Sequence, residues 1–357
     1  MYGACLTLRG TLSGDMGTTS NRFDFIRLVL ASGVFLFHVV ALSAAEQTPL
    51  ELNLAVLGEL CIQGFFIVSG ALVYGSYERS KSLSDYAGKR IRRLYPAYAV
   101  VILIPATIAL LLTLAAPGRI PQILEYVGAN LLFLNFLEPN LPGLFESNRF
   151  PAVNGALWTL KIEVMFYLVL PFIAWVLAQM GRLWWIGIAA LIIGAFVWKA
   201  AILALENPYS PQLARQLPGQ MMYFAAGIAL WRVLDLVRGQ ALTVFWIGVI
   251  ALTLSLSVPS LDALRVLGLT GLIAGVAFMP GPALNVAAWG DVSYGVYITH
   301  FPILQALVAM GVFSMLGPIA SGVLSAALVF AASYALWWWV EKPALRADSH
   351  YRKVSEK

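Results

Sequence analysis

The chain is dominated by apolar stretches, each about as long as a membrane-spanning helix. A helix needs roughly 20 apolar residues to cross a bilayer, and ten stretches approach that length. Of the 357 residues, 60% are hydrophobic and 11% are charged, against about 25% charged in an average soluble domain. This composition excludes a soluble enzyme, a disordered chain and a nucleic-acid binder. The predicted spans are 23–45, 52–75, 94–116, 156–178, 183–205, 218–234, 241–258, 261–280, 290–312 and 317–340.

The basic residues predict the orientation of these spans, because Lys and Arg concentrate on cytoplasmic loops. With both termini in the cytoplasm, that side receives the basic run 79–93 and the basic C-terminal segment. An apolar piece at 126–137 is too short to cross and is predicted to be re-entrant or interfacial. The sequence therefore predicts an all-α polytopic membrane protein with about ten transmembrane helices. Its parts are a cytoplasmic tail at 1–21, a membrane domain at 22–341 and a cytoplasmic tail at 342–357.

Three ionisable side chains from three predicted spans lie at a similar depth. His38, Glu59 and Glu163 each lie seven residues from the predicted outer end of their span, which is about 10 Å along a helix. An ionisable group inside a bilayer is costly and points to a function, so a shared cavity is predicted. The alternatives are structural: His38 as a hydrogen-bonding residue, and Glu163 paired with Lys161 or Lys199.

The chemistry available to such groups centres on the histidine. A neutral imidazole takes a proton from a hydroxyl near neutral pH, and a carboxylate on its other nitrogen would fix the tautomer. The chain has no G-x-S-x-G motif, no glycine-rich phosphate loop and three dispersed histidines, at positions 38, 300 and 350. The sequence therefore predicts acid–base chemistry by a side chain, without a metal ion.

Arginine residues gather at the predicted cytoplasmic side. Arg22, Asp24 and Arg27 stand at the start of the first span, and Arg90 and Arg93 are one helical turn apart. Guanidinium groups at that spacing suit bidentate capture of phosphates. The alternative is that these arginines only set the topology and bind anionic lipid head groups.

Six motifs follow one another along the chain. They are Arg22-Phe-Asp24-Phe-Ile-Arg27 with His38 after ten further residues, Phe65-Phe66-Ile-Val-Ser69-Gly70, Arg90-Ile-Arg92-Arg93-Leu-Tyr95-Pro96, Trp158-Thr159-Leu-Lys161-Ile-Glu163-Val-Met-Phe166-Tyr167, Ser293-Tyr294-Gly-Val-Tyr297-Ile-Thr-His300-Phe-Pro302 and Glu341-Lys342-Pro343. In this order they resemble the membrane-bound acyltransferase family 3, whose members include O-acetyltransferases of bacterial surface polysaccharides. Two positions depart from the family pattern: Thr159 stands where serine is usual, and Gln63 where many members have an acidic residue.

The resemblance implies transfer of an acyl group, usually acetyl, from cytoplasmic acyl-CoA to a hydroxyl of a carbohydrate or glycan-lipid acceptor. It implies a multi-pass protein of the bacterial inner membrane, with His38 as general base or as a covalent acyl relay. Glu163 would orient His38 or hold the acceptor, and Arg27, Arg90 and Arg93 would bind the phosphates of the coenzyme. The expected partners are acyl-CoA, the acceptor and membrane lipids, with no metal and no nucleic acid. Supporting residues are expected at Arg22, Asp24, Glu59, Ser69, Trp158, Tyr167, Ser293, Tyr297 and His300.

Several of these residues also have a structural interpretation. Ser69 and the glycine after it predict a close-packing site, because small residues let membrane helices approach each other. Trp158, Tyr167 and the tryptophans 337–339 are typical of an interfacial aromatic belt. His300, which stands near Pro302, would satisfy the backbone of a kinked helix.

A different class of function is the runner-up. In a proton-coupled secondary transporter or exporter of a glycan, the membrane carboxylates and the histidine would form a proton relay. Such transporters carry paired repeats with broken helices, and no internal repeat is visible. A catalytically silent sensor on the same scaffold is the third interpretation.

Overall fold

The computed structural model describes residues 22–113, 117–286, 290–347 and 349, and over these residues the chain is helical with no β-strand. A π-helical turn, Trp337–Glu341, joins the last two helices. The α-helices are α1 Phe23–Ser43, α2 Pro49–Glu78, α3 Leu83–Leu112, α4 Ile120–Leu131, α5 Trp158–Gln179, α6 Trp184–Leu203, α7 Ser210–Ala214, α8 Leu217–Arg232, α9 Leu234–Gly239, α10 Ala241–Ser257, α11 Leu264–Phe278, α12 Val292–Ala309, α13 Val312–Leu336 and α14 Lys342–Ala344.

Seven helical stretches in the described part of the chain are long and apolar enough to cross a membrane, in agreement with a polytopic membrane protein. Each of the ten predicted spans coincides with a helix, but α8, α10 and α11 have only 16, 17 and 15 residues. These three are shorter than the roughly 20 residues that a full crossing requires. The number of spans and the cytoplasmic placement of both ends stay predictions.

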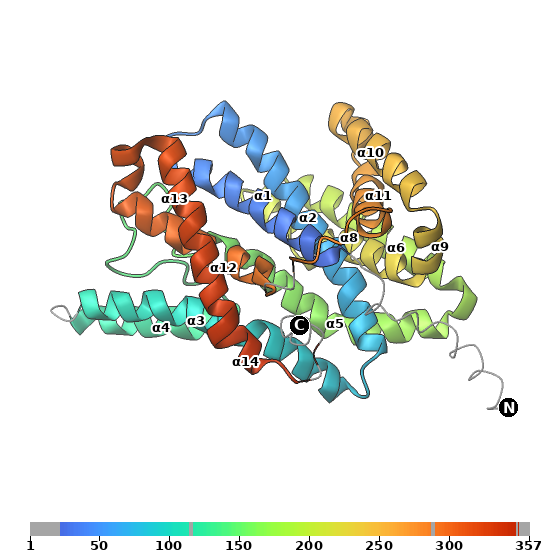
Figure 1. The fold of residues 1–357 in the computed structure, drawn as a ribbon, viewed down its shortest axis with the longest axis horizontal. Helices are drawn as coiled ribbons and strands as arrows, with labels where there is room; N and C mark the ends of the chain where they lie inside the picture. The colour runs from blue at the N-terminus through green and yellow to red at the C-terminus, as the bar shows by residue number, and fades with distance from the viewer. Residues whose placement is uncertain (1–21, 114–116, 287–289, 348, 350–357) are drawn as a thin grey trace.

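The structure corrects one local prediction and gives the helical bounds of another segment, whose re-entrant or interfacial placement stays a prediction. The basic run at 79–93 is not a loop, because α3 already begins at Leu83. The predicted segment 126–137 is helical only as far as Leu131, where α4 ends, and α4 begins earlier, at Ile120. Figure 1 shows α4 lying side by side with α3, and the two helices are in contact.

Hydroxyl side chains set the starts of the two longest helices. The first four N–H groups of a helix have no partner within it, and a side-chain oxygen at the N-cap satisfies one of them. Thr48 accepts from the N–H of Glu51 at 3.1 Å at the start of α2. Ser82 accepts from the N–H of Asp85 at 3.1 Å at the start of α3. The arginines of α3 therefore lie within about the first three turns of a helix with a defined start.

Two groups of helices meet along α2. On one side α1 packs against α2 and α12, and α12 packs against α13. On the other side α2 packs against α8, which packs against α6, while α10 and α11 form a pair at the far edge (Figure 1). Helix α5 contacts both α2 and α8. The site residues therefore come from α1, α2, α3, α5 and α12.

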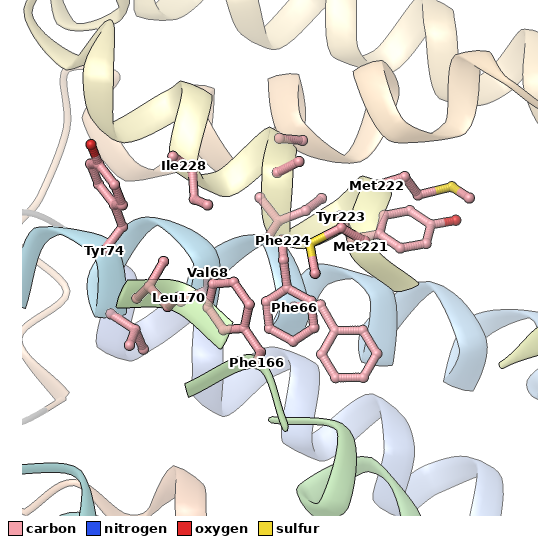
Figure 2. Packing of buried hydrophobic residues seen from close by; sticks show 14 of the residues in the cluster. Phe66, Val68, Tyr74, Phe166, Leu170, Met221, Met222, Tyr223, Phe224 and Ile228 are labelled. Atoms are coloured by element: carbon pink, nitrogen blue, oxygen red, sulfur yellow. The ribbon is translucent and has the colours of Figure 1, made fainter. Parts of the chain in front are cut away.

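The crossing of α2 with α8 and α5 is filled by aromatic rings. Figure 2 shows Phe66, Phe166 and Phe224 together, with ring centroids 4.7 Å apart for Phe66–Phe224 and 3.9 Å for Phe166–Phe224. Gly70 and Gly227 let the two backbones touch, because a Cβ on either would collide with the other helix. This contact confirms the predicted close-packing site for Gly70.

Candidate active site

His38 of α1 and His300 of α12 face each other. Nδ1 of His38 lies 3.0 Å from Nε2 of His300, and Nδ1 of His300 lies 3.0 Å from the carbonyl oxygen of Val296. A carbonyl oxygen only accepts, so Nδ1 of His300 carries a proton. With both rings neutral, Nε2 of His300 then accepts from Nδ1 of His38. The lone pair of His38 is left on Nε2, where it can take a proton from a substrate.

The surroundings of this histidine pair are apolar. The rings of Phe37 and Phe301 lie 4.8 Å and 5.1 Å from that of His38, and His300 is completely buried. An isolated charge is costly in such a place, so the surroundings favour two neutral rings. In the described part of the chain, no three His, Cys, Asp or Glu side chains are placed to hold a metal ion.

The predicted structural role of His300 is met in part, because its Nδ1 bonds the carbonyl oxygen of Val296 on the same helix. Pro302 has no N–H, so the carbonyl that it leaves without a helical partner is that of Ile298. That carbonyl accepts from Nδ2 of Asn154 at 2.8 Å, from the segment before α5. The side chain of His300 is therefore not needed for the backbone at the proline, and its Nε2 is directed to His38.

Glu163 of α5 forms a second polar group. Its Oε1 accepts from the hydroxyl of Ser69 on α2 at 3.0 Å and from the hydroxyl of Tyr167 at 2.5 Å. Among the described residues the ring partner of His38 is His300 and not Glu163, so the expected direct orientation of His38 by Glu163 is not found. The predicted pairing of Glu163 with a lysine is also wrong, because Lys161 lies over a phenylalanine ring and Lys199 lies 3.8 Å from an aspartate.

Tyr297 connects the two polar groups. Its hydroxyl lies 2.6 Å from that of Thr159, one helical turn before Glu163. Its ring centroid lies 6.0 Å from that of His300, one turn further along α12. Thr159 keeps a hydroxyl at a position where serine is usual, and this hydroxyl contacts Tyr297. The histidine pair and Glu163 therefore belong to one continuous interior region.

A buried ion cluster lies at the other end of α1 and α12. Asp291 is 3% exposed and pairs with Arg27 of α1 at 2.6 Å and with Arg93 of α3, and Arg93 also binds Glu341 at 2.6 Å. Burial raises the pKa of Asp291, but the two guanidinium groups outweigh burial and hold this pKa at about 2, below its usual 3.8. Asp24 stands 3.9 Å from Arg27. Two arginines thus face three carboxylates.

The remaining predicted arginines lie in different settings. Arg90 donates to the hydroxyl of Ser76 at 3.1 Å and lies over the ring of Tyr167 at 5.8 Å. Arg22 is buried and donates to the carbonyl oxygens of Val276 and Pro282, each at 3.0 Å. Arg22 therefore holds the end of α11 to the start of α1. Of the three arginines expected at the donor phosphates, Arg90 is the one whose contacts with the described residues include no carboxylate.

Comparison with known proteins agrees with the resemblance that the ordered motifs indicate. A family model described as an acyltransferase domain matches residues 20–339. The chain belongs to the acyltransferase 3 family. It is 28% identical to "Nodulation protein 10" of Rhizobium leguminosarum bv. viciae over 91% of this chain and 93% of that protein. It is also 28% identical to the "O-acetyl transferase" of Shigella phage Sf6, over 92% of this chain and 97% of that protein.

A third relative of this acyltransferase matches over a shorter length. The chain is 26% identical to "Acyltransferase MdmB" of Streptomyces mycarofaciens over 60% of this chain and 54% of that protein. No solved structure matches the chain.

The aromatic residues of the family motifs are not a uniform interfacial belt. Tyr167 bonds Glu163 in the interior, and Trp158 is half-buried against the aromatic core. Trp337 is completely buried, whereas Trp339 is 81% exposed. Successive side chains on a helix point in different directions, so a run of three tryptophans cannot face one surface. The belt prediction is wrong for Tyr167 and Trp337.

Two outcomes concern acidic residues of this acyltransferase. Glu59 does not join His38 and Glu163 in one cavity, because its partners are Gln63 at 2.9 Å and Arg265 at 4.0 Å, on another side of α2. Asp291, the centre of the ion cluster, is missing from the predicted site. The only signal for it is an acidic residue two positions before Ser293, whose hydroxyl donates to it at 2.7 Å.

Proposed function

We propose that this acyltransferase moves an acetyl group from cytoplasmic acetyl-CoA to a carbohydrate hydroxyl on the outer side of a bacterial inner membrane. The histidine pair carries the proposal, since its hydrogen bonds leave Nε2 of His38 as the base. Two relatives named as an O-acetyl transferase and an acyltransferase support acyl transfer. The carbohydrate acceptor and the coenzyme donor follow from the family resemblance.

The proposed step is an exchange of one ester for another. Nε2 of His38 takes the proton of the acceptor hydroxyl, and its oxygen attacks the thioester carbonyl carbon. The tetrahedral intermediate collapses with loss of the C–S bond, and the thiolate of the coenzyme takes the proton back from His38. His300 keeps Nδ1 of His38 protonated throughout, which holds the lone pair toward the substrate.

In this proposal Glu163 positions the acceptor. Its Oε1 already receives hydrogen bonds from Ser69 and Tyr167, which fix the carboxylate in place. Its second oxygen lies outside these two hydrogen bonds and would accept from another hydroxyl of the acceptor. Glu163 would then position the sugar while His38 removes the proton.

The donor would enter from the end of the bundle that carries the arginines. Arg90 would bind a phosphate of the coenzyme directly, because its present contacts are a hydroxyl and an aromatic ring. Arg27 and Arg93 would add positive charge beside it while they hold Asp291. Arg27 and His38 are eleven residues apart on α1, about 16 Å along the helix, which separates a phosphate anchor from a reacting thioester.

The test is mass analysis of surface glycans from four strains: a gene deletion, and deletions complemented with the wild type, His38→Ala or His350→Ala. We expect an acyl mass to be absent from one glycan in the deletion and in His38→Ala, and present in the other two. His350→Ala is the matched control in the C-terminal tail. Normal acylation with His38→Ala at wild-type protein levels would contradict the proposal.

A covalent route through acetyl-His38 predicts a different intermediate. In that route purified protein with radiolabelled acetyl-CoA alone becomes acetylated at His38 within a single turnover. Direct transfer predicts no label on the protein. The wild type and His38→Ala, quenched at millisecond to second times, separate the two routes.

A further inference from the structure

A second polar cavity lies on the opposite side of α2 from the histidine pair. It has a volume of about 160 Å³ and is formed by α2, α6, α7 and α8, space for about five water molecules. Its polar lining consists of Glu59, Gln63, Lys199, Arg215, Gln220 and Tyr223. Its rim is open, since Leu203, Pro211 and Arg215 are exposed.

This cavity is separate from the candidate active site. On α2, Gly58 and Gly64 face α1, where Phe37 and Leu30 fill the space beside them. Glu59 directly follows Gly58, and Gln63 directly precedes Gly64. Because neighbouring residues on a helix point in different directions, the side chains of Glu59 and Gln63 point to another side of α2, away from α1. One small ligand therefore cannot occupy the cavity and contact His38 at the same time.

Two amide oxygens at the cavity have no hydrogen-bond donor. Oε1 of Gln63 and Oε1 of Gln220 are both buried without a partner, in residues that are 2% and 9% exposed. The orientation of Gln63 is fixed, because its Nε2 donates to Glu59 at 2.9 Å. A buried acceptor without a donor is destabilising, because it has lost its hydrogen bonds to water. Both side chains line the cavity, so a ligand that displaces them slightly can offer hydroxyl groups as the donors.

The charges around the cavity argue against an anion as its ligand. Arg265 binds Asp262 at 2.6 Å and approaches Glu59 at 4.0 Å, and Lys199 lies 3.8 Å from Asp262. Arg265 and Lys199 are therefore balanced by carboxylates, while Arg215 lies on the exposed rim. A phosphate would also meet the two amide oxygens and Glu59, all of which repel it. Neutral hydroxyls can donate to the oxygens and accept from the cations.

We propose that this cavity is a carbohydrate subsite that binds a neutral sugar unit of the acceptor other than the unit that is acylated. The inference rests on the proposed carbohydrate acceptor. Gln63, Gln220 and Glu59 accept from sugar hydroxyls, Lys199 and Arg215 donate to sugar oxygens, and Tyr223 supplies a ring beside them. The acceptor is then an oligomer with one unit at His38 and another on the far side of α2.

The test uses the full-length protein in nanodiscs, acetyl-CoA, and the alkali-deacylated surface glycan identified by the mass analysis. Gln63→Leu and Gln220→Leu keep the side-chain volume and remove the acceptor oxygen. Each is expected to raise the KM for the glycan by about three- to tenfold, with kcat and the slow hydrolysis of acetyl-CoA unchanged. Gln216→Leu is the matched control, because it makes the same change one turn earlier, outside the cavity lining.

Three other outcomes would overturn the inference. An unchanged KM in both variants, with active wild type, removes the subsite and leaves the proposed function standing. Competitive inhibition by inorganic phosphate that is lost in Arg215→Ala assigns the cavity to an anion. Hydrolysis of acetyl-CoA by the wild type, without transfer to any surface glycan, rejects the carbohydrate acceptor and the subsite together.

Discussion

Two polar contacts that the structure describes between α1 and the start and middle of α12 differ in kind. Near the start of both helices Arg27 is paired with Asp291, and further along His38 is hydrogen-bonded to His300. The first contact is ionic and continues into α3 through Arg93. The second is neutral and lies among phenylalanine rings.

The difference separates stability from chemistry along the same two helices. A buried ion cluster fixes geometry, because removal of one member leaves the others uncompensated. A neutral imidazole pair can gain and lose a proton during a reaction. The ionic end therefore holds the helices in register, and the neutral end has the freedom to react.

Asp291→Asn is expected to have the largest effect on the whole protein. It leaves Arg27 and Arg93 without their shared carboxylate, at a cost of about 3–5 kcal/mol. The measurement is the melting temperature of the detergent-purified protein, with Asp24→Asn as the control, since Asp24 is only a 3.9 Å neighbour of Arg27. Equal melting temperatures for the two variants would contradict the central place of Asp291.

The same cluster predicts how the stability of the protein depends on pH. A pKa held at about 2 in the folded state, below the usual 3.8, gives a stabilisation that is complete above the usual value. It is lost only as the pH falls through 2. The contribution of Asp291, measured as the difference in melting temperature between wild type and Asp291→Asn, should therefore be the same at pH 5 and pH 7. A smaller difference at pH 5 would show that the carboxylate is not held ionised.

His300→Leu is expected to lower kcat about a hundredfold, because His38 loses the acceptor that fixes its tautomer. The KM for the glycan and the melting temperature should stay near those of the wild type. His300→Gln places an amide oxygen near Nδ1 of His38 and should recover part of kcat. If leucine and glutamine give the same kcat, the hydrogen bond to His38 has no part in the reaction.

Arg90→Ala should raise the KM for acetyl-CoA about tenfold or more, because a charge-assisted hydrogen bond contributes about 1.5–3 kcal/mol. Arg92→Ala is the matched control, since Arg92 is exposed on the same turn of α3. The KM for the glycan should not change in either variant. Equal effects of the two alanines on the KM for acetyl-CoA would assign α3 to lipid head groups instead.

Thr159→Val should have the smallest effect. Valine keeps the shape and removes the hydroxyl partner of Tyr297, at about 1 kcal/mol. Tyr297 keeps a longer contact to the carbonyl oxygen of Ala156, at 3.4 Å. A slightly lower melting temperature with full activity is expected, and a loss of activity larger than the loss of stability would place Tyr297 in the chemistry.

The positions of the helices could be predicted from the sequence because hydropathy is a local property. Every predicted span contains a helix, including the short α8, α10 and α11. Hydropathy did not predict the start of α3 at Leu83, because the first turns of this helix are polar. The capping residue Ser82 is the sequence signal for this start. The family motifs likewise selected His38, Glu163 and Arg90 before any contact was known.

The partners of these residues could not be predicted, because each contact joins distant parts of the chain. His38 and His300 are 262 residues apart, and Asp291 is 198 residues from Arg93. Equal depth of His38, Glu59 and Glu163 gave no information on which way each side chain faces. One residue of difference on α2, Gly58 against Glu59, decides whether a side chain meets α1 or the second cavity.

The number of residues between Arg27 and His38 limits the insertions and deletions that α1 can accept. Eleven residues make just over three full turns at about 3.6 residues per turn, so both side chains lie on nearly the same face of α1, toward α12. An inserted or deleted residue between them would shift one against the other by about 1.5 Å and rotate it by about 100°. Substitutions at exposed positions of this interval, such as Leu36, leave this phase unchanged, whereas the length of the interval is fixed by the phase of the helix.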